Sequence, residues 1–165
     1  MKKLNKTKKF SYITMLSALA ILLNVIEGMF IPPVIFGIRI GIANIIALIT
    51  IELFDIKSMI IVNVNRVLIG SILRGMIFGS TFWVSASGVI LSTIVLSILS
   101  SIKSSIPFKS IMSAIAHSTG QVFAIMILYQ NINMISILSI LLITSIITGF
   151  LTSYVSILVL KRIKV

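Results

Sequence analysis

The chain has 165 residues, of which 58% are hydrophobic, and its mean hydropathy is +1.22. Charged residues make up only 10% of it, whereas about a quarter of the residues of a soluble domain are charged. The composition therefore excludes a soluble globular domain, and it predicts an all-α integral membrane protein whose main partner is the lipid bilayer.

The formal net charge of +11 arises from 14 Lys and Arg residues against three acidic residues. The basic residues do not alternate with aromatic residues on a polar face, so we expect no nucleic-acid partner. The chain has no cysteine and one histidine, and neither a metal site nor a cofactor is expected from such a set.

Six apolar runs are long enough to cross a membrane, which requires about 20 residues each. Proline, glycine, lysine and polar clusters separate these runs, and they predict one membrane domain over residues 1–165 that forms a six-helix bundle. The predicted spans are 11–27, 38–54, 57–77, 82–101, 109–129 and 134–160.

The basic residues predict the orientation of these spans, because cytoplasmic loops are enriched in Lys and Arg. With six spans and a cytoplasmic N-terminus, eleven of the fourteen basic residues fall on the cytoplasmic side and none in the outer loops. We therefore expect a multi-pass protein of a bacterial-type cytoplasmic membrane with both termini in the cytoplasm. The basic residues left over are Arg39, Arg66 and Arg74.

The two ends of the first span give two further expectations. The preceding run is MKKLNKTKK, which is typical of a signal peptide, but no small-residue cleavage pattern follows it, so we expect an uncleaved first helix. The segment after the span is GMFIPPVIFG, and Pro32-Pro33 within it predicts an ordered loop.

Polar residues share one stripe of the third predicted helix. At 100° per residue, Asn63, Arg66, Gly70 and Arg74 fall within roughly an 80° sector. An arginine in hydrocarbon costs on the order of 3 kcal/mol, so it normally faces the bundle interior or a cavity. Two interpretations stay open for each arginine. One is a donor that binds an anion. The other is a structural residue, with Arg66 bonded to helix carbonyls and Asn side chains and Arg74 extended to the outer headgroups.

Further polar residues are expected at a similar depth. In the fifth helix, Ser113, His117, Gly120 and Gln121 share roughly a 100° face, and in the second helix Asn44 is expected about 9 Å from the outer end. The candidate ligand-binding residues are Arg66, Arg74, Arg39, Asn44, Asn63, His117 and Gln121.

The charges near this set are unequal. Glu27 ends the first helix on the outer side and is expected to pair with Arg39 or Arg74. Two or three arginines then face one carboxylate, which predicts an anionic small-molecule ligand.

Two series of small residues spaced by four predict close helix packing. They are Ser71, Gly75 and Gly79 in one part of the chain, and Ser145, Gly149 and Ser153 in another. No catalytic constellation is recognisable among three acidic residues and one histidine, so we expect a protein that is not an enzyme, or at most a non-catalytic subunit.

Four stretches resemble the family named heptaprenyl diphosphate synthase component I, also called Gx transporter proteins. They are PPVIFGIRIGIAN (32–44), RVLIGSILRGMIFGSTFWVSASG (66–88), SAIAHSTGQ (113–121) and TGFLTSYVSILVLKR (148–162). The resemblance implies a relation to the substrate-binding S components of energy-coupling factor transporters, which are six-helix proteins with an outward-facing pocket.

Three functional hypotheses follow. The first is an S-component-like subunit that binds or transports a small anionic or amphipathic solute from the outer side. The second is the non-catalytic membrane component of a heptaprenyl or polyprenyl diphosphate synthase in isoprenoid quinone synthesis, with a soluble partner. The third is a structural subunit of a larger membrane complex.

Overall fold

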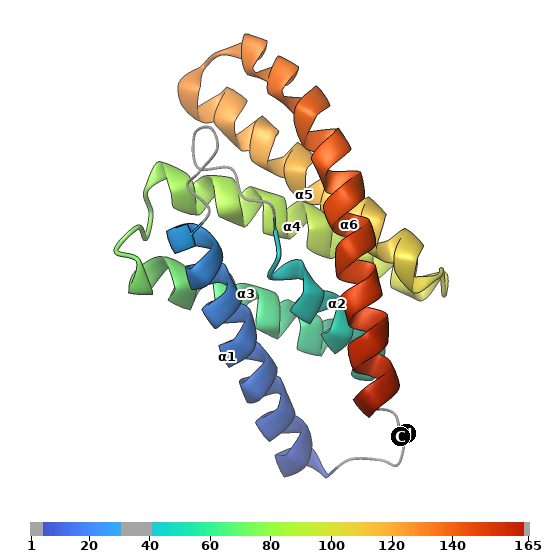
Figure 1. The fold of residues 1–165 in the computed structure, drawn as a ribbon. Helices are drawn as coiled ribbons and strands as arrows, with labels where there is room; N and C mark the ends of the chain where they lie inside the picture. The colour runs from blue at the N-terminus through green and yellow to red at the C-terminus, as the bar shows by residue number, and fades with distance from the viewer. Residues whose placement is uncertain (1–4, 31–40, 164–165) are drawn as a thin grey trace.

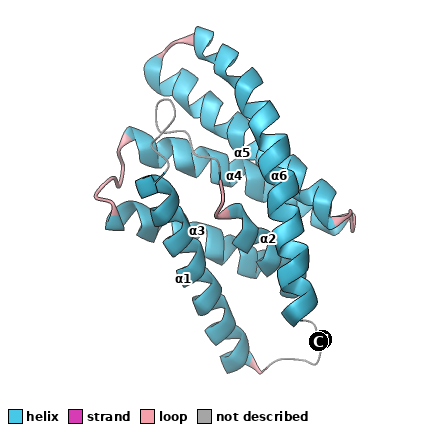
Figure 2. Ribbon diagram, viewed as in Figure 1, coloured by secondary structure: helices cyan, strands magenta, loops and turns pink. Residues whose placement is uncertain are grey.

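The computed structural model describes residues 5–30 and 41–163, and these residues form six α-helices, one short 3₁₀ helix and no strands. The predicted all-α fold is confirmed. The helices are α1 (Lys6–Phe30), α2 (Asn44–Leu53), α3 (Ile56–Leu73), α4 (Ser80–Ser101), α5 (Ile106–Tyr129), the 3₁₀ helix η1 (Ile132–Ile135) and α6 (Ser136–Ile163) (Figures 1 and 2).

Five of these helices are long and apolar enough to cross a membrane, and α2 is the exception with ten residues. The described part of the predicted span 38–54 is therefore helical only from Asn44 to Leu53. Gly41 gives the physical reason, because its φ of +86° is incompatible with a right-handed helix. Ten helical residues extend about 15 Å, roughly half the hydrocarbon thickness.

The short helix α2 lies in the interior of the bundle. It packs against α1, α3, α5 and α6, and Figure 1 shows it enclosed by the longer helices. Most of its side chains are buried, and they are Ile46, Ala47, Leu48, Ile49, Thr50, Ile51 and Leu53. A helix that is apolar on all sides is expected at such a position.

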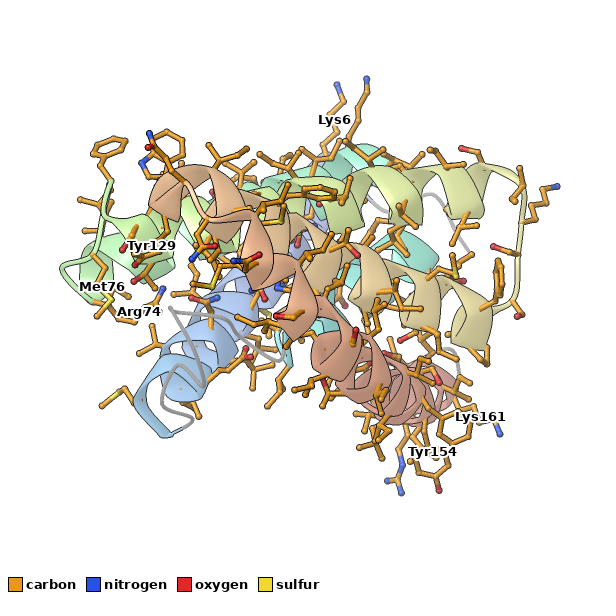
Figure 3. All side chains as sticks on the ribbon, turned by 90° about the horizontal axis from the view of Figure 1, so that it is seen from above. Lys6, Arg74, Met76, Tyr129, Tyr154 and Lys161 are labelled. Atoms are coloured by element: carbon orange, nitrogen blue, oxygen red, sulfur yellow. The ribbon has the colours of Figure 1, made fainter. Side chains whose placement is uncertain are left out.

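The described chain ends and turns fall into two groups. The start of α1, the α2–α3 junction, the α4–α5 turn and the end of α6 lie toward the lower right of Figure 1, and the remaining turns lie toward the upper left. Figure 3 shows Lys161 at one end and Arg74 with Tyr129 at the opposite end. This arrangement agrees with helices that cross a layer in alternating directions.

Two interhelical ion pairs form at the end that contains the α2–α3 junction. Lys9 Nζ lies 2.5 Å from Asp55 Oδ2, and Lys109 Nζ lies 2.5 Å from Glu52 Oε1. Asp55 also caps α3 by accepting from the Ser58 N–H at 2.8 Å. The hydrogen bond from Lys9 is the main cause that lowers the Asp55 pKa to about 2, and the Ser58 N–H adds to it.

The small residues of α6 pack as predicted, whereas those after α3 do not. Ser145 and Ser153 are buried, and a Cβ added to Gly149 would lie 2.7 Å from Ile111 Cα. Gly75, by contrast, has open space where a Cβ would be, and its φ of +64° lies in the turn after α3. The prediction of a packed ridge through Gly75 and Gly79 was wrong because the helix ends at Leu73.

The first prediction concerns the two ion pairs, which have equal lengths but different burial. The side chains of Lys109 and Glu52 are 7% and 17% exposed, against 38% and 46% for Lys9 and Asp55. We expect Lys109→Met to lower the free energy of unfolding by about 3 kcal/mol, since it leaves a largely buried carboxylate unpaired. Lys9→Met is the matched control and is expected to cost less than about 1 kcal/mol.

Unfolding in detergent micelles by titration with sodium dodecyl sulfate measures both values. The double variant Lys109→Met/Glu52→Gln is expected to recover at least half of the loss, because no buried charge then remains unpaired. Equal losses of unfolding free energy in Lys109→Met and Lys9→Met would contradict the larger contribution expected from the buried Lys109–Glu52 pair.

The second prediction concerns the close contact between α4 and α5. A Cβ added to Gly120 would lie 2.6 Å from the Ser87 carbonyl oxygen and 3.0 Å from Gly88 Cα. Both groups belong to the backbone and cannot rotate away, so Gly120→Ala is expected to cost about 1–3 kcal/mol. Gly79→Ala is the control, because the nearest atom to its added Cβ is the Met76 carbonyl oxygen at 3.4 Å. A Gly120→Ala variant as stable as Gly79→Ala would show that α4 and α5 separate freely.

Candidate functional site

Four helices, α1, α3, α4 and α5, and the turn before α2 enclose a small polar cavity, which we call the Arg66 cavity. Its volume is ≈ 10 Å³ for the centre of a water molecule, about what a single water needs. The residues that line it are Asn24, Glu27, Gly41, Ala43, Arg66, Ser85, Val89 and His117.

Arg66 is the largest fully buried side chain in the described structure, with 1% of its surface exposed. Its Nη2 donates a hydrogen bond to Asn44 Oδ1 at 2.6 Å. Its Nε and Nη1 have no hydrogen-bond partner within the described residues. Buried polar groups are almost always bonded, so a guanidinium with two free donor groups at a cavity wall is the most unusual feature of this site.

Asn44 is placed by the start of α2. It is the first residue of that helix, following a turn through Gly41, Ile42 and Ala43. The expectation that Asn44 lies about 9 Å inside the second helix was wrong, because the left-handed backbone of Gly41 precedes the helix and α2 begins at Asn44. A Cβ at Gly41 would approach Asn44 Nδ2 to 2.8 Å, so this glycine is needed for the close approach.

Glu27 on α1 supplies the countercharge of the cavity. It is 2% exposed, and its Oε1 accepts from the Gly41 N–H at 2.5 Å. The backbone of Ile42 and Ala43 also interacts with this carboxylate, and both Arg66 and Arg74 are close enough to interact with it electrostatically. Glu27 therefore fixes the start of α2 while it faces two arginines, and the sequence had not predicted its place beside Arg66.

Arg74 lies outside the Arg66 cavity and joins α3 to α1. It follows the last residue of α3, where its Nε donates to the Gly70 carbonyl at 2.8 Å and its Nη2 to Asn24 Oδ1 at 3.1 Å. A Cβ added to Gly28 would lie 2.8 Å from Arg74 Nη1, so the guanidinium packs directly on α1. These contacts favour the structural interpretation of Arg74.

His117 and Gln121 form one polar pair on α5. Their Nε2 atoms lie 3.0 Å apart, and the two side chains are 3% and 0% exposed. Because an amide Nε2 only donates, the His117 Nε2 accepts and the ring proton is assigned to Nδ1. Of the two residues, only His117 lines the Arg66 cavity.

Asn63 shares the predicted stripe with Arg66 but faces a different neighbour. Its Nδ2 donates to Thr93 Oγ1 on α4 at 2.7 Å and contacts Met59 Sδ at 3.2 Å. The structure thus brings Arg66, Asn44 and His117 together, and it separates Asn63 from them. Arg39 and the Pro32-Pro33 loop lie outside the described residues.

The sequence analysis did not identify the polar lining residues Asn24 and Ser85, nor the place of Glu27 beside Arg66. The spacing of Asn24 and Glu27 by three residues was a usable signal, since it places both on one face of α1. Within the described ranges, no three His, Asp or Glu side chains lie close enough together to hold a metal ion. The arrangement supplies hydrogen-bond donors and positive charge, which suit a carboxylate or phosphate group.

Comparison with known proteins gives one family. The family model described as heptaprenyl diphosphate synthase component I matches residues 16–159. The search of curated proteins gives no match, and neither does the search of solved structures. Since the matched region covers most of the 165 residues, this chain belongs to the heptaprenyl diphosphate synthase component I family.

Proposed function

We propose that this multi-pass membrane protein is a subunit that binds a small solute through an anionic group, with Arg66 as the anchor. The observation that supports this proposal is the buried guanidinium with two donor groups that no described residue accepts. A carboxylate or phosphate oxygen at the cavity would accept from them and would supply the missing negative charge.

The charges around Arg66 favour a bound ligand, rather than an acidic residue of the chain, as the source of the balancing negative charge. Glu27 is the acidic residue that faces the cavity, but its carboxylate already accepts from the backbone at the start of α2. Its negative charge is also shared between Arg66 and Arg74. Two cations around one carboxylate leave a net positive charge, which a bound anion would balance.

The size of the Arg66 cavity requires a wider state for binding. A volume of ≈ 10 Å³ holds one water and no organic anion. The part of the wall that is not a helix is the turn from Gly41 to Ala43, which Glu27 holds. We propose that this turn moves when a solute enters, because displacing a turn disturbs less side-chain packing than separating two helices.

The proposed direction of binding is from the outer side of a bacterial cytoplasmic membrane. This rests on the excess of basic residues at one end of the bundle, where Lys161 lies, and on the position of Arg74 at the other end. A protein with this orientation would resemble the solute-binding S components of energy-coupling factor transporters.

The family name supports a second candidate, a non-catalytic membrane component of a polyprenyl diphosphate synthase. Exposed basic residues at one end of the bundle, which include Lys103, Lys161 and Arg162, would contact a soluble partner. Lys109 at the same end is buried against Glu52 and is not available for docking.

The third prediction tests the anion site. We expect a small anionic compound to remain with the chain purified in mild detergent and to be identified by mass spectrometry of the extracted material. Arg66→Lys is expected to reduce the amount retained about tenfold or more, because lysine keeps the charge but loses the planar donor fork. Arg74→Lys is the matched control and is expected to change it less than about threefold.

Equal retention by the two variants, or retention unchanged in Arg66→Lys, would contradict the role of Arg66. The unfolding titration distinguishes loss of binding from loss of fold, since both variants keep a cation opposite Glu27. Uptake of the identified compound into vesicles that contain the chain then separates transport from binding alone.

The fourth prediction tests the second candidate. If the exposed basic residues dock a soluble synthase subunit, the triple variant Lys103→Glu/Lys161→Glu/Arg162→Glu should no longer co-purify with that subunit. The new carboxylates would carry the same sign of charge as the partner surface and would repel it. Co-purification should also weaken as salt rises from about 0.05 to 0.5 M. Association that is insensitive to both changes would exclude this surface, and a synthase whose product length does not depend on this chain would exclude the function.

A further inference from the structure

A second concave site lies between α3 and α4. This α3–α4 groove has a volume of ≈ 460 Å³, which is within the range of small-molecule sites. Apart from Asn63 and Thr93 its wall is apolar, and the residues that matter below are Asn63, Val64, Trp83, Ala86, Ile90 and Thr93.

The medium next to the groove is hydrocarbon. Both helices are candidate membrane spans, and side chains at the edges of the groove are exposed, among them Val64 at 48% and Ile90 at 59%. An occupant therefore enters from the lipid phase, and it is itself lipid-soluble.

Asn63 adds a polar requirement to this apolar site. The residue is 3% exposed and lines the groove, and its Nδ2 is used by Thr93 Oγ1. Its Oδ1 has no hydrogen-bond partner within the described residues. A hydrocarbon chain alone would leave this acceptor unpaired, and water is scarce at this depth. The occupant that satisfies the site carries one hydrogen-bond donor on an apolar body.

The neighbouring groove between α4 and α5 offers a comparison, because none of its described lining residues has an unpaired polar atom such as Asn63 Oδ1. It has the same volume, ≈ 460 Å³, and it also includes Trp83 and Ile90. Its polar side chain is Ser87, whose Oγ donates to the Gly120 carbonyl at 2.8 Å. No unpaired buried side-chain atom is found among the residues that line this second groove, so it requires nothing beyond ordinary lipid chains.

We propose that the α3–α4 groove binds a lipid-soluble alcohol or phenol, whose hydroxyl donates a hydrogen bond to Asn63 Oδ1 and whose apolar chain lies along the groove. Thr93 orients the amide through its bond to Nδ2. This site shares Val89 but no polar group with the lining of the Arg66 cavity, and each site is tested with its own variants.

Trp83 allows a direct test, because it is the single tryptophan of the chain and it lines the groove. The full chain in detergent micelles is titrated with farnesol, and with farnesene as the probe that has a similar chain but no hydroxyl. We expect farnesol to change the Trp83 fluorescence with a midpoint about fivefold lower than farnesene, as one additional hydrogen bond allows. In Asn63→Leu the two midpoints are expected to become equal.

Two variants that fill a groove locate the binding. Ala86→Phe fills the α3–α4 groove and should abolish the response to farnesol, whereas Ala124→Phe fills the α4–α5 groove and should preserve it. Equal midpoints for farnesol and farnesene on the unaltered chain would overturn the proposal without any variant. A farnesol preference that survives in Asn63→Leu, or that is lost in Ala124→Phe but not in Ala86→Phe, would also overturn it.

Discussion

The burial of the Arg66 guanidinium is the constraint on which the arrangement of the first three helices depends. A charged side chain in hydrocarbon is unfavourable by about 3 kcal/mol or more, and α3 places this one where 1% of its surface is exposed. Its compensation comes from two other helices, through the Asn44 oxygen of α2 and the Glu27 charge of α1. Asn44 begins α2 and Glu27 accepts from the backbone just before it, so the buried guanidinium and the start of α2 position one another.

Glu27 links this electrostatic requirement to the unusual second helix. The first N–H groups of α2, those of Asn44, Ile45 and Ile46, bond to the carbonyls of the preceding turn, but lipid cannot satisfy the N–H groups of that turn itself. The Glu27 carboxylate accepts from the Gly41 N–H and so supplies what water supplies in a soluble protein. The same carboxylate faces Arg66, and the short helix and the buried arginine therefore stabilise each other. Arg74 has a more local role, since it joins the end of α3 to Asn24 of α1.

The sequence was sufficient for the long helices and for the inward orientation of Arg66, because both follow from the free energy of placing side chains in lipid. It was insufficient for the partners of the polar residues. Helical periodicity gives an angle about the helix axis, and the roughly 80° sector of Asn63 and Arg66 is wide enough to face two neighbours. In the structure Arg66 faces α1 and α2, while Asn63 faces α4. The positions of Gly41 and Gly75 in left-handed backbone also required the structure, since a glycine is compatible with a helix as well as with a turn.

Val89 on α4 connects the two candidate sites, because its side chain lines both the Arg66 cavity and the α3–α4 groove. It is 6% exposed and packs in a cluster with Val67 and Phe82. A β-branched side chain has few rotamers and seldom moves independently of its backbone. A molecule that widens the Arg66 cavity by displacing Val89 would therefore narrow the groove, and an occupied groove would oppose that displacement. A polar anion and a lipid alcohol would then compete through one valine although they touch no common polar group, and an amphipathic ligand that fills both sites at once would need Val89 to be displaced.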